Sequence, residues 1–432
     1  MPDPRYIIAA YDYLGPKHAG PAIRTLALAR QLSKIGDVDI IFEGEAPSDQ
    51  PARISFIEKG SVDLSAGFFL KYKAALVPPL VAMTVPQILE SDIPVVVDLF
   101  DPVVWENLLL YKSEPEKDRQ FQHERHLAAL IAALFRGDYF IVAGKRQQDL
   151  FLGSLMALNR VNPSTWIEKS GPGQLVGLVP FGLPDGQPPD PDETAIPDIY
   201  SAGGNIAVWG GGMWDWLCPE TVVKAWPMVL KRYPDAILAF PGTDHPNPHV
   251  PEMASVGRVR KLSRELGIEK NVVFGSWLPR DEYLALLGRA SVGVSAHSPG
   301  LEATYAVRTR FLDSIWMGLP MVVSGDDEYS SIIAEQELGV VIESESPTDF
   351  ANGIIHVMDQ GRGAYAGMFA RARSELTWSK AAAELVEWMV EPRITHGSGI
   401  QFFRDTVGDV APRERPSDLG SLVNRVIKKL RN

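Results

Sequence analysis

The chain has 432 residues, of which 45% are hydrophobic, so it is long enough for two domains of about 200 residues, each with its own core. Its formal net charge of −12 argues against a general nucleic-acid binder, because phosphate backbones require a basic face; a basic pocket for one small anion stays compatible with it. The single cysteine, Cys218, excludes an internal disulfide, and no apolar run reaches the ~20 residues of a membrane helix. We expect a soluble, cytoplasmic protein.

The first half of the chain alternates strands with helices. Helical patterns over about residues 21–34 and from Lys145 onward separate short runs rich in β-branched and aromatic residues. The expected strands are residues 5–12, 38–44, 93–101 and 138–144. This alternation predicts an α/β fold with a doubly wound parallel sheet, a Rossmann-like domain over residues 1–183.

Residues 184–204 are dense in proline, glycine and aspartate, which is typical of a linker. The strand–helix alternation resumes over residues 205–390, where "SKAAAELVEWMV" (residues 379–390) is expected to close a second Rossmann-like domain. Two such domains leave an interdomain cleft at the carboxyl ends of both sheets, where ligands bind in this architecture.

The tail, residues 391–432, ends in "LGSLVNRVIKKLRN". Its apolar residues lie on one face of a predicted amphipathic helix, and its basic residues lie off that face. Two interpretations stay open: a helix docked on its own protein, and a peripheral contact with the inner membrane face.

Two segments offer chemistry. In "HAGPAIRTLALARQL", which begins at His18, Gly20 delivers the chain to a helix N-terminus that suits an anion, although for this loop taken alone a simple tight turn is the favoured explanation. After the strand that ends at Ser295, the second segment carries Glu302, Arg308, Arg310 and Asp313. Its carboxylates can accept hydrogen bonds from sugar or ribose hydroxyls, and its guanidinium groups can hold phosphate oxygens. Alternatively, both arginines pair with Glu302 and Asp313 as a structural network.

The chain up to about residue 390 resembles GT-B-fold nucleotide-sugar glycosyltransferases of the retaining family 4 type. The resemblance rests on "GPAIRTLALARQL", "LVPFGL", "VVFGSWLPRDEYLALLGRASVGVSAHS" and "LDSIWMGLPMVVSGDD". It implies transfer of a sugar from a nucleotide-diphosphate donor to a hydroxyl acceptor, with retention of configuration, and it implies a donor site on the second domain. It also implies that backbone groups of Ser276 and Leu278 contact the nucleobase.

The chain departs from the family pattern at its carboxylates. The family has two glutamates eight residues apart, and the second stands five residues before the glycine of "GLP". Asp313 occupies that second position and is expected to hold the ribose, whereas Tyr305 occupies the first. Glu302 lies three residues earlier, so a longer loop would present it to the donor sugar.

A further departure concerns "WGGGMWDWLCPETVVK", which has the family's glycines but neither of its two phosphate-binding cations. Gly211 and Gly212 keep a close backbone approach to the donor, and Arg308 and Arg310 are the expected substitutes for the missing charge. The following Trp214, Asp215 and Trp216 are expected to form a wall against the sugar or acceptor; alternatively, the two tryptophans pack in the domain interface.

On the acceptor side, Asp101 is the best candidate to polarise an acceptor hydroxyl, or else it caps the turn before Pro102. His18 is a candidate for the acceptor wall. We expect no cofactor beyond the donor and no metal, because the diphosphate would be stabilised by the arginines and the helix end at Gly20. Prolines keep His245 and His249 off a common helix face.

The sequence therefore predicts a glycosyltransferase of cell-surface polysaccharide, glycoconjugate or natural-product assembly. The main alternative is a GT-B-fold binding or scaffold protein that has lost activity, which the missing cations and first glutamate favour. A dinucleotide-dependent oxidoreductase is disfavoured by glycine spacing, since neither "GPKHAGPA" nor the triple glycine fits G-x-G-x-x-G.

Overall fold

The computed structural model describes residues 3–10, 12–15, 19–47, 51–166, 174–201, 204–244, 253–343 and 345–395. The chain divides into two compact units: one combines Met1–Pro180 with the residues from Ala381 onward, and the other is Phe181–Lys380. His18, the histidines at 245 and 249, and the predicted amphipathic helix of the tail lie outside the described residues.

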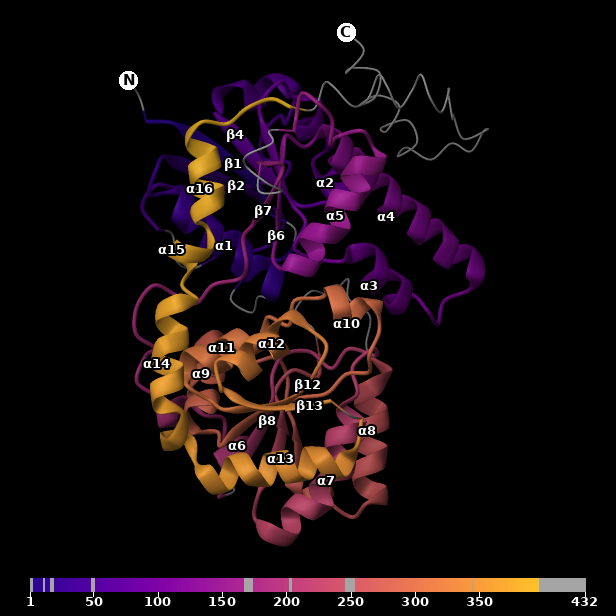
Figure 1. Ribbon diagram of the computed structural model, residues 1–432, viewed down its shortest axis with the longest axis vertical. Helices are drawn as coiled ribbons and strands as arrows, with labels where there is room; N and C mark the ends of the chain where they lie inside the picture. Colours follow the sequence, from indigo (N-terminus) through magenta and orange to yellow (C-terminus); the bar gives the residue numbers. More distant parts are fainter. Residues whose placement is uncertain are drawn as a thin grey trace. The chain divides into compact units, whose positions relative to one another are not determined.

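The first unit contains a seven-stranded sheet in the order β3-β2-β1-β4-β5-β6-β7, and every neighbouring pair is parallel (Figure 1). The strands are β1 (Arg5–Ala9), β2 (Asp37–Phe42), β3 (Ile54–Glu58), β4 (Ala74–Val77), β5 (Val95–Asp98), β6 (Tyr139–Val142) and β7 (Val176–Leu178). The helices are α1 (Gly20–Leu32), α2 (Val81–Thr84), α3 (Val103–Leu110), α4 (Glu116–Arg136), α5 (Lys145–Ala157) and α16 (Ala383–Val390). Strand order reverses between β1 and β4, and ligand sites of doubly wound sheets form at such a point.

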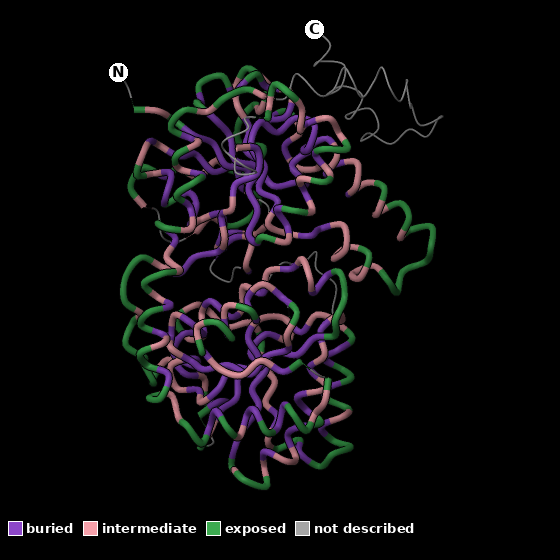
Figure 2. Tube along the Cα trace, viewed as in Figure 1, coloured by how far each residue is buried: buried purple, intermediate pink, exposed green. Residues whose placement is uncertain are grey.

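The strands form where the sequence has continuous apolar runs. All four residues of β4 and of β6 are buried, as parallel strands covered on both faces require (Figure 2). Pro21 stands in the first turn of α1, where a missing N–H costs nothing. The sequence predicted β1, β2, β5 and β6, and it did not predict β3, β4 or β7.

Helix α16 belongs to the first unit, which corrects the prediction that residues 379–390 close the second domain. Its Trp388 ring stacks on Tyr139 of β6 at 5.2 Å, and the Leu178 N–H of β7 donates to Glu384 at 2.9 Å. The apolar face of α16 fits this sheet, and adjacency in sequence does not reveal which sheet a helix will cover.

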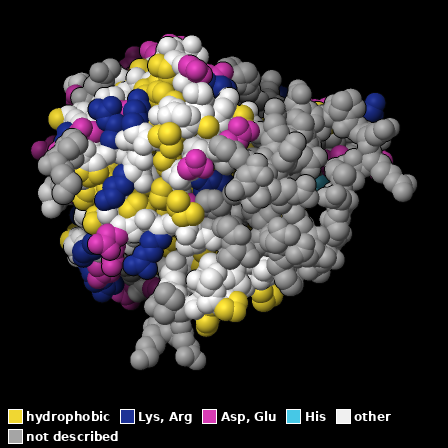
Figure 3. All heavy atoms as spheres, turned by 90° about the horizontal axis from the view of Figure 1, so that it is seen from above, with side chains coloured by type: hydrophobic (Ala, Val, Ile, Leu, Met, Phe, Trp, Pro, Cys, Tyr) yellow, Lys and Arg dark blue, Asp and Glu magenta, His cyan; other side chains and the backbone are white. Residues whose placement is uncertain are grey.

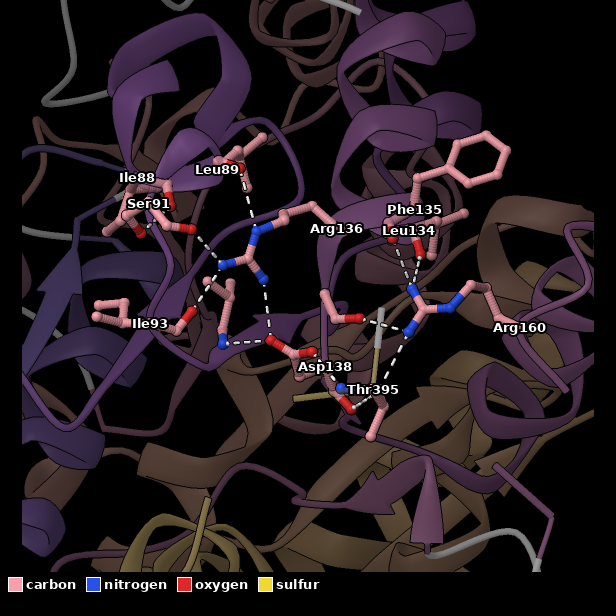
Figure 4. Close-up of polar contacts among 12 residues, drawn as sticks. Ile88, Leu89, Ser91, Ile93, Leu134, Phe135, Arg136, Asp138, Arg160 and Thr395 are labelled. Carbon is pink, nitrogen blue, oxygen red and sulfur yellow. Dashed lines mark hydrogen bonds and ion pairs between the residues drawn. The ribbon is translucent and has the colours of Figure 1, made fainter. Parts of the chain in front are cut away.

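A buried polar cluster holds the chain beyond α16 to the first unit (Figure 4). Arg136 donates to Asp138 at 2.9 Å and to the carbonyls of Leu89, Ser91 and Ile93. Asp138 accepts the backbone N–H of Thr395 at 2.6 Å. The last described segment is thereby hydrogen-bonded to the start of β6.

The second unit contains a parallel six-stranded sheet in the order β10-β9-β8-β11-β12-β13. The strands are β8 (Ile206–Trp209), β9 (Ile237–Phe240), β10 (Val272–Phe274), β11 (Val292–Ser295), β12 (Met321–Ser324) and β13 (Gly339–Ile342). The helices are α6 (Asp198–Ser201), α7 (Pro219–Arg232), α8 (Ala254–Glu265), α9 (Arg280–Arg289), α10 (Leu301–Tyr305), α11 (Arg310–Met317), α12 (Glu328–Glu335), α13 (Pro347–Gln360), α14 (Ala366–Glu375) and α15 (Trp378–Ala381), which ends at the unit boundary. Here strand order reverses between β8 and β11. Helices α7 and α13 lie side by side along one face of this sheet (Figure 1).

The predicted linker is partly ordered onto the second unit. Within residues 184–204, Ile196 and the fully buried Tyr200 of α6 join the core formed by β8 and α9. Proline and aspartate in this segment serve a short 3-10 turn (Glu193–Ala195), in which Asp192 accepts the N–H of Thr194. No helix among the described residues is long and apolar enough to cross a membrane.

Candidate functional site

The glycine loop of the second unit lies where its strand order reverses. Gly210, Gly211 and Gly212 follow β8, and Gly211 has φ +69°, a conformation that favours glycine. A Cβ on Gly210 would stand 2.9 Å from the Tyr283 hydroxyl. The Tyr283 hydroxyl therefore packs tightly against Gly210, and the backbone of the loop lies close to the carboxyl ends of the strands.

Arg310, the first residue of α11, reaches this loop from 100 residues away. Its guanidinium donates to the Gly210 carbonyl at 2.7 Å and to the Gly212 carbonyl at 3.2 Å, and it lies 5.7 Å from the centre of the Trp209 ring. Burial, with Arg308 nearby, lowers the pKa of Arg310 to about 10, so the group stays charged at neutral pH. The loop that lacks a cation in sequence thus has one in space.

Arg308 is engaged differently. Both of its terminal nitrogens donate to the two carboxylate oxygens of Glu302 on α10, each at 2.7 Å, and both side chains are buried. The structural pairing that the sequence left open is therefore present for Glu302. This pairing neutralises Arg308 as a source of net charge, so Arg310 is the better placed of the two to attract a diphosphate.

Asp313 pairs with an arginine that sequence analysis did not consider. Arg280, the first residue of α9, donates to both oxygens of Asp313 at 2.8 and 2.7 Å. The Asp313 side chain is 18% exposed, so part of the carboxylate still faces solvent. Its expected role at the ribose stays a prediction, with Arg280 now fixing its orientation.

The segment after the glycine loop is largely structural. Trp214 and Trp216 stack on each other with ring centres 5.1 Å apart. Asp215 accepts the backbone N–H groups of Ala254 and Ser255, so its carboxylate caps the start of α8. Contact between these side chains and a sugar stays a prediction, and the structure gives Asp215 another task.

Two buried groups beside this site were underrated or missed in the sequence. His297, two residues beyond β11, is buried, and burial followed by Arg308 lowers its pKa to about 3, against a smaller opposite effect of the Gly325 carbonyl. Asp327, at the start of α12, is fully buried, and burial raises its pKa to about 6 against the attraction of Arg308. The preceding Asp326 has φ +80°, an unusual conformation for a residue other than glycine.

In the first unit, the strand-end charges are paired with each other. Arg24 of α1, which begins at Gly20, donates to both oxygens of Asp98, the last residue of β5, at 2.6 and 2.9 Å. Asp101 lies three residues beyond the strand, and Pro102, not Asp101, occupies the N-cap position of α3. The Arg24–Asp98 pair was not predicted from the sequence. Its signal there was a charged residue on the buried face of α1, Arg24, and another at the end of a run of valines, Asp98.

The remaining predictions concern the nucleobase, metals and nucleic acid. Ser276 and Leu278 lie in the loop between β10 and α9, at the same sheet edge as the glycine loop. Within the described residues, no group of three or more His, Cys, Asp and Glu is arranged to hold a metal ion. Among the described residues, the face in Figure 3 mixes basic, acidic and apolar side chains.

The comparisons with known proteins point to one family. The family model described as glycosyl transferases group 1 matches residues 205–360. This segment is therefore similar to group 1 glycosyltransferases. It spans the glycine loop, Glu302, Arg310 and Asp327, so the site described above lies within the segment that resembles this family. No curated protein sequence matches the chain significantly.

Solved structures of glycosyltransferases share the fold of the whole chain. A glycosyltransferase from Rickettsia africae matches with a TM-score of 0.57 and 10% identity, over 90% of this chain and 100% of that one. WaaG, a glycosyltransferase of lipopolysaccharide biosynthesis, matches with a TM-score of 0.53 and 14% identity, over 94% of this chain and 100% of that one. Anabaena HepE in complex with UDP-glucose matches with a TM-score of 0.56 and 12% identity, over 89% of this chain and 99% of that one. The predicted GT-B class, with two Rossmann-like domains, is confirmed.

Proposed function

We propose that the protein transfers a sugar from a nucleotide-diphosphate sugar to a hydroxyl acceptor, in the assembly of a polysaccharide, glycoconjugate or glycosylated small molecule. The observation that carries the proposal is the placement of Arg310 on the glycine loop inside the segment that resembles group 1 glycosyltransferases. Structural neighbours of the same fold bind UDP and UDP-glucose, which supports a nucleotide-sugar donor.

The donor's diphosphate would lie at the ends of β8 and β11. There it would meet Arg310 and the closely approaching backbone of the glycine loop, at a point where the charge of the leaving nucleotide develops. Arginine suits this task because its planar fork binds phosphate oxygens while other N–H groups hold the protein backbone. We propose that this arginine takes the part that a metal plays elsewhere, and that configuration at the sugar is retained.

Two carboxylates would hold the rest of the donor. Asp313, oriented by Arg280, would accept hydrogen bonds from ribose hydroxyls. Glu302, oriented by Arg308, would face the sugar, where its charge would stabilise the positive character that develops as the bond to the nucleotide breaks. Asp101 would serve the acceptor side.

The test is a thermal-shift screen of UDP-, GDP-, ADP- and dTDP-linked sugars, followed by an assay for donor hydrolysis and transfer with the best binder. Arg310→Ala should weaken binding of that donor about 100-fold, since it removes a charged phosphate contact. Arg264→Ala, which removes an exposed arginine of α8, is the matched control and should bind normally.

The outcomes separate the proposal from its rival. Turnover by the wild type with loss of binding in Arg310→Ala supports the enzyme. Tight binding without hydrolysis or transfer, across a panel of sugar and lipid-linked acceptors, would instead indicate a binding protein that keeps the fold without the activity. Absence of binding to every donor would contradict the donor site itself.

A further inference from the structure

A carboxyl group beside the donor site has an oxygen with no hydrogen-bond partner among the described residues. Asp327 caps α12: its Oδ1 accepts the Ser330 N–H at 2.8 Å, and the Ser330 hydroxyl accepts the Asp327 N–H in return. Its Oδ2 is fully buried and makes no such bond. A buried carboxylate oxygen without a donor is costly, so this atom requires a proton or an incoming partner.

His297 faces that oxygen. The His297 Nε2 lies 3.8 Å from Asp327 Oδ2, and neither ring nitrogen makes a hydrogen bond of normal geometry within the described chain. Ser295, two residues earlier, is also buried with an unbonded hydroxyl. Three polar side chains at the ends of β11 and β12 thus lie in a place that excludes water and does not satisfy them.

The net charge of the groups around Asp327 depends on whether Asp327 itself is ionised. Glu302 and Arg308 cancel each other as a bidentate pair, and Arg310 remains as a partly buried cation. The titratable and charged groups that face Asp327 from the surrounding elements are His297 after β11, Glu302 on α10, Arg308 and Arg310 at the start of α11, Asp326 and Glu328 on its own loop and helix, and Glu343 beside Gly325 after β13. Glu302, Arg308, Arg310 and Asp327 together have no net charge when Asp327 is ionised and a charge of +1 when it is protonated.

Building on the proposed function, we propose that Asp327 is a proton-accepting positioning residue of the donor site, which takes up one proton from solvent when a nucleotide sugar binds and returns it when the nucleotide leaves. Two negative charges arriving at Arg310 disfavour a second buried anion nearby, so the carboxylate is neutralised. The resulting O–H can turn to the His297 nitrogen and satisfy both unbonded atoms. No covalent step is involved.

The pKa values of Asp327 and His297 decide which of the two side chains takes the proton. Burial already raises the pKa of Asp327 to about 6, so a modest further rise carries it through neutral pH. Burial, with Arg308, lowers the pKa of His297 to about 3, so the imidazole would need a far larger change to become charged. Arg308 opposes protonation of the carboxyl without preventing it.

The test is calorimetric titration of the full chain with UDP-glucose, or with the tightest binder among the GDP-, ADP- and dTDP-linked glucoses, in buffers of different ionisation enthalpy. The diphosphate of such a donor is esterified at both ends and does not titrate near pH 6, unlike a terminal phosphate. We expect uptake of roughly half a proton per donor at pH 7, and a dissociation constant that rises roughly tenfold between pH 6 and pH 8.

Variants assign the proton. Asp327→Asn should abolish uptake and flatten the pH dependence, and it should fold because asparagine caps helices as well as aspartate does. Asp326→Asn, which removes the neighbouring exposed carboxylate, is the matched control and should behave like the wild type. His297→Gln should still take up the proton. Uptake that survives in Asp327→Asn, or that is lost in His297→Gln alone, would overturn the assignment.

The experiment also distinguishes this inference from the proposed function. Donor binding by the wild type without proton uptake contradicts the role of Asp327 and leaves the glycosyltransferase proposal standing. Failure of every nucleotide sugar to bind contradicts both.

Discussion

Each unit buries a cluster of arginines and carboxylates, and the two clusters differ in how fully they are satisfied. In the first unit, Arg136 is held by Asp138 and three backbone carbonyls. In the second unit, Arg308 is held by Glu302, but the adjoining His297 and Asp327 keep buried polar atoms that no described residue bonds. The first cluster is closed by the fold, and the second is open.

The difference follows from position. The closed cluster lies at the end of α4 and the start of β6, where Arg136 donates to the carbonyls of Leu89, Ser91 and Ile93, which precede β5. The open cluster lies at the carboxyl ends of β11 and β12, where doubly wound folds bind ligands. Unsatisfied buried groups are costly in a folded protein, so we propose that a ligand completes the bonding of His297 and Asp327 at this edge.

The largest effect is expected from breaking the closed cluster. Asp138→Ala removes the charge partner of Arg136 and the acceptor for the Val95 and Thr395 N–H groups, so it should lower the free energy of unfolding of the first unit by about 3–5 kcal/mol. Hydrogen exchange of peptides from each unit localises the loss. Asp149→Ala removes a partner from the exposed pair with Lys145 and should change stability by less than about 0.5 kcal/mol.

Breaking the open cluster should affect chemistry more than folding. Glu302→Gln keeps the shape of the side chain and removes its charge, so donor turnover should fall about 100-fold, equivalent to about 2.7 kcal/mol at the transition state. Arg308→Lys keeps a cation beside Glu302 and should retain much more activity. Equal losses in both variants would show that the pair acts as a structural unit and that Glu302 has no separate role at the sugar.

The stability of the second unit should depend on pH through Asp327. The folded-state pKa of about 6 lies above the ordinary value of about 3.9, so between pH 4 and pH 6 the folded state binds more protons and the free energy of unfolding falls as pH rises. Asp327→Asn should therefore gain about 2 kcal/mol relative to the wild type at pH 8 and nothing at pH 4. Chemical denaturation at the two pH values measures this difference.

His297 acts in the opposite direction in the same experiment. Its folded-state pKa of about 3 lies below the ordinary 6.5, so its contribution to the free energy of unfolding rises with pH between 3 and 6.5. His297→Gln should remove that rise and steepen the fall that Asp327 causes. A stability profile unchanged in both variants would show that neither group is as buried as the structure has it.

The sequence predicted what local patterns can carry. Apolar runs such as the one around Val95 predicted strands, and the helical pattern over about residues 21–34 predicted α1. It did not predict β3, whose residues are partly exposed at the sheet edge, or β7, which has three residues. Short or half-exposed strands have too little periodicity to distinguish them from loops.

Of the pairings in the candidate site, only that of Arg308 with Glu302 was among the alternatives that the sequence left open. Arg310 was expected to supply a cation, but its contact with Gly210 depends on how α11 packs against β8, which no spacing in the sequence reveals. The same holds for Arg280 and Asp313, which are 33 residues apart. Asp327 drew no attention because an aspartate before a helix is usually an exposed cap, and only the fold shows that this one is buried.

The smallest expected effect tests whether the closed cluster is what holds the chain beyond α16. The Thr395 hydroxyl donates to the Asp138 carbonyl at 2.8 Å and accepts from Arg160 at 3.2 Å, while its backbone N–H bonds to the Asp138 carboxylate. Thr395→Val keeps the shape and the backbone bond and removes both hydroxyl bonds, so the first unit should lose about 1 kcal/mol. Thr395→Ser retains the hydroxyl and should lose less. If hydrogen exchange in α16 accelerates in the valine variant and not in the serine variant, the hydroxyl anchors this segment; equal exchange in both would assign the anchoring to the Trp388 stack on Tyr139 and to the Glu384 bond instead.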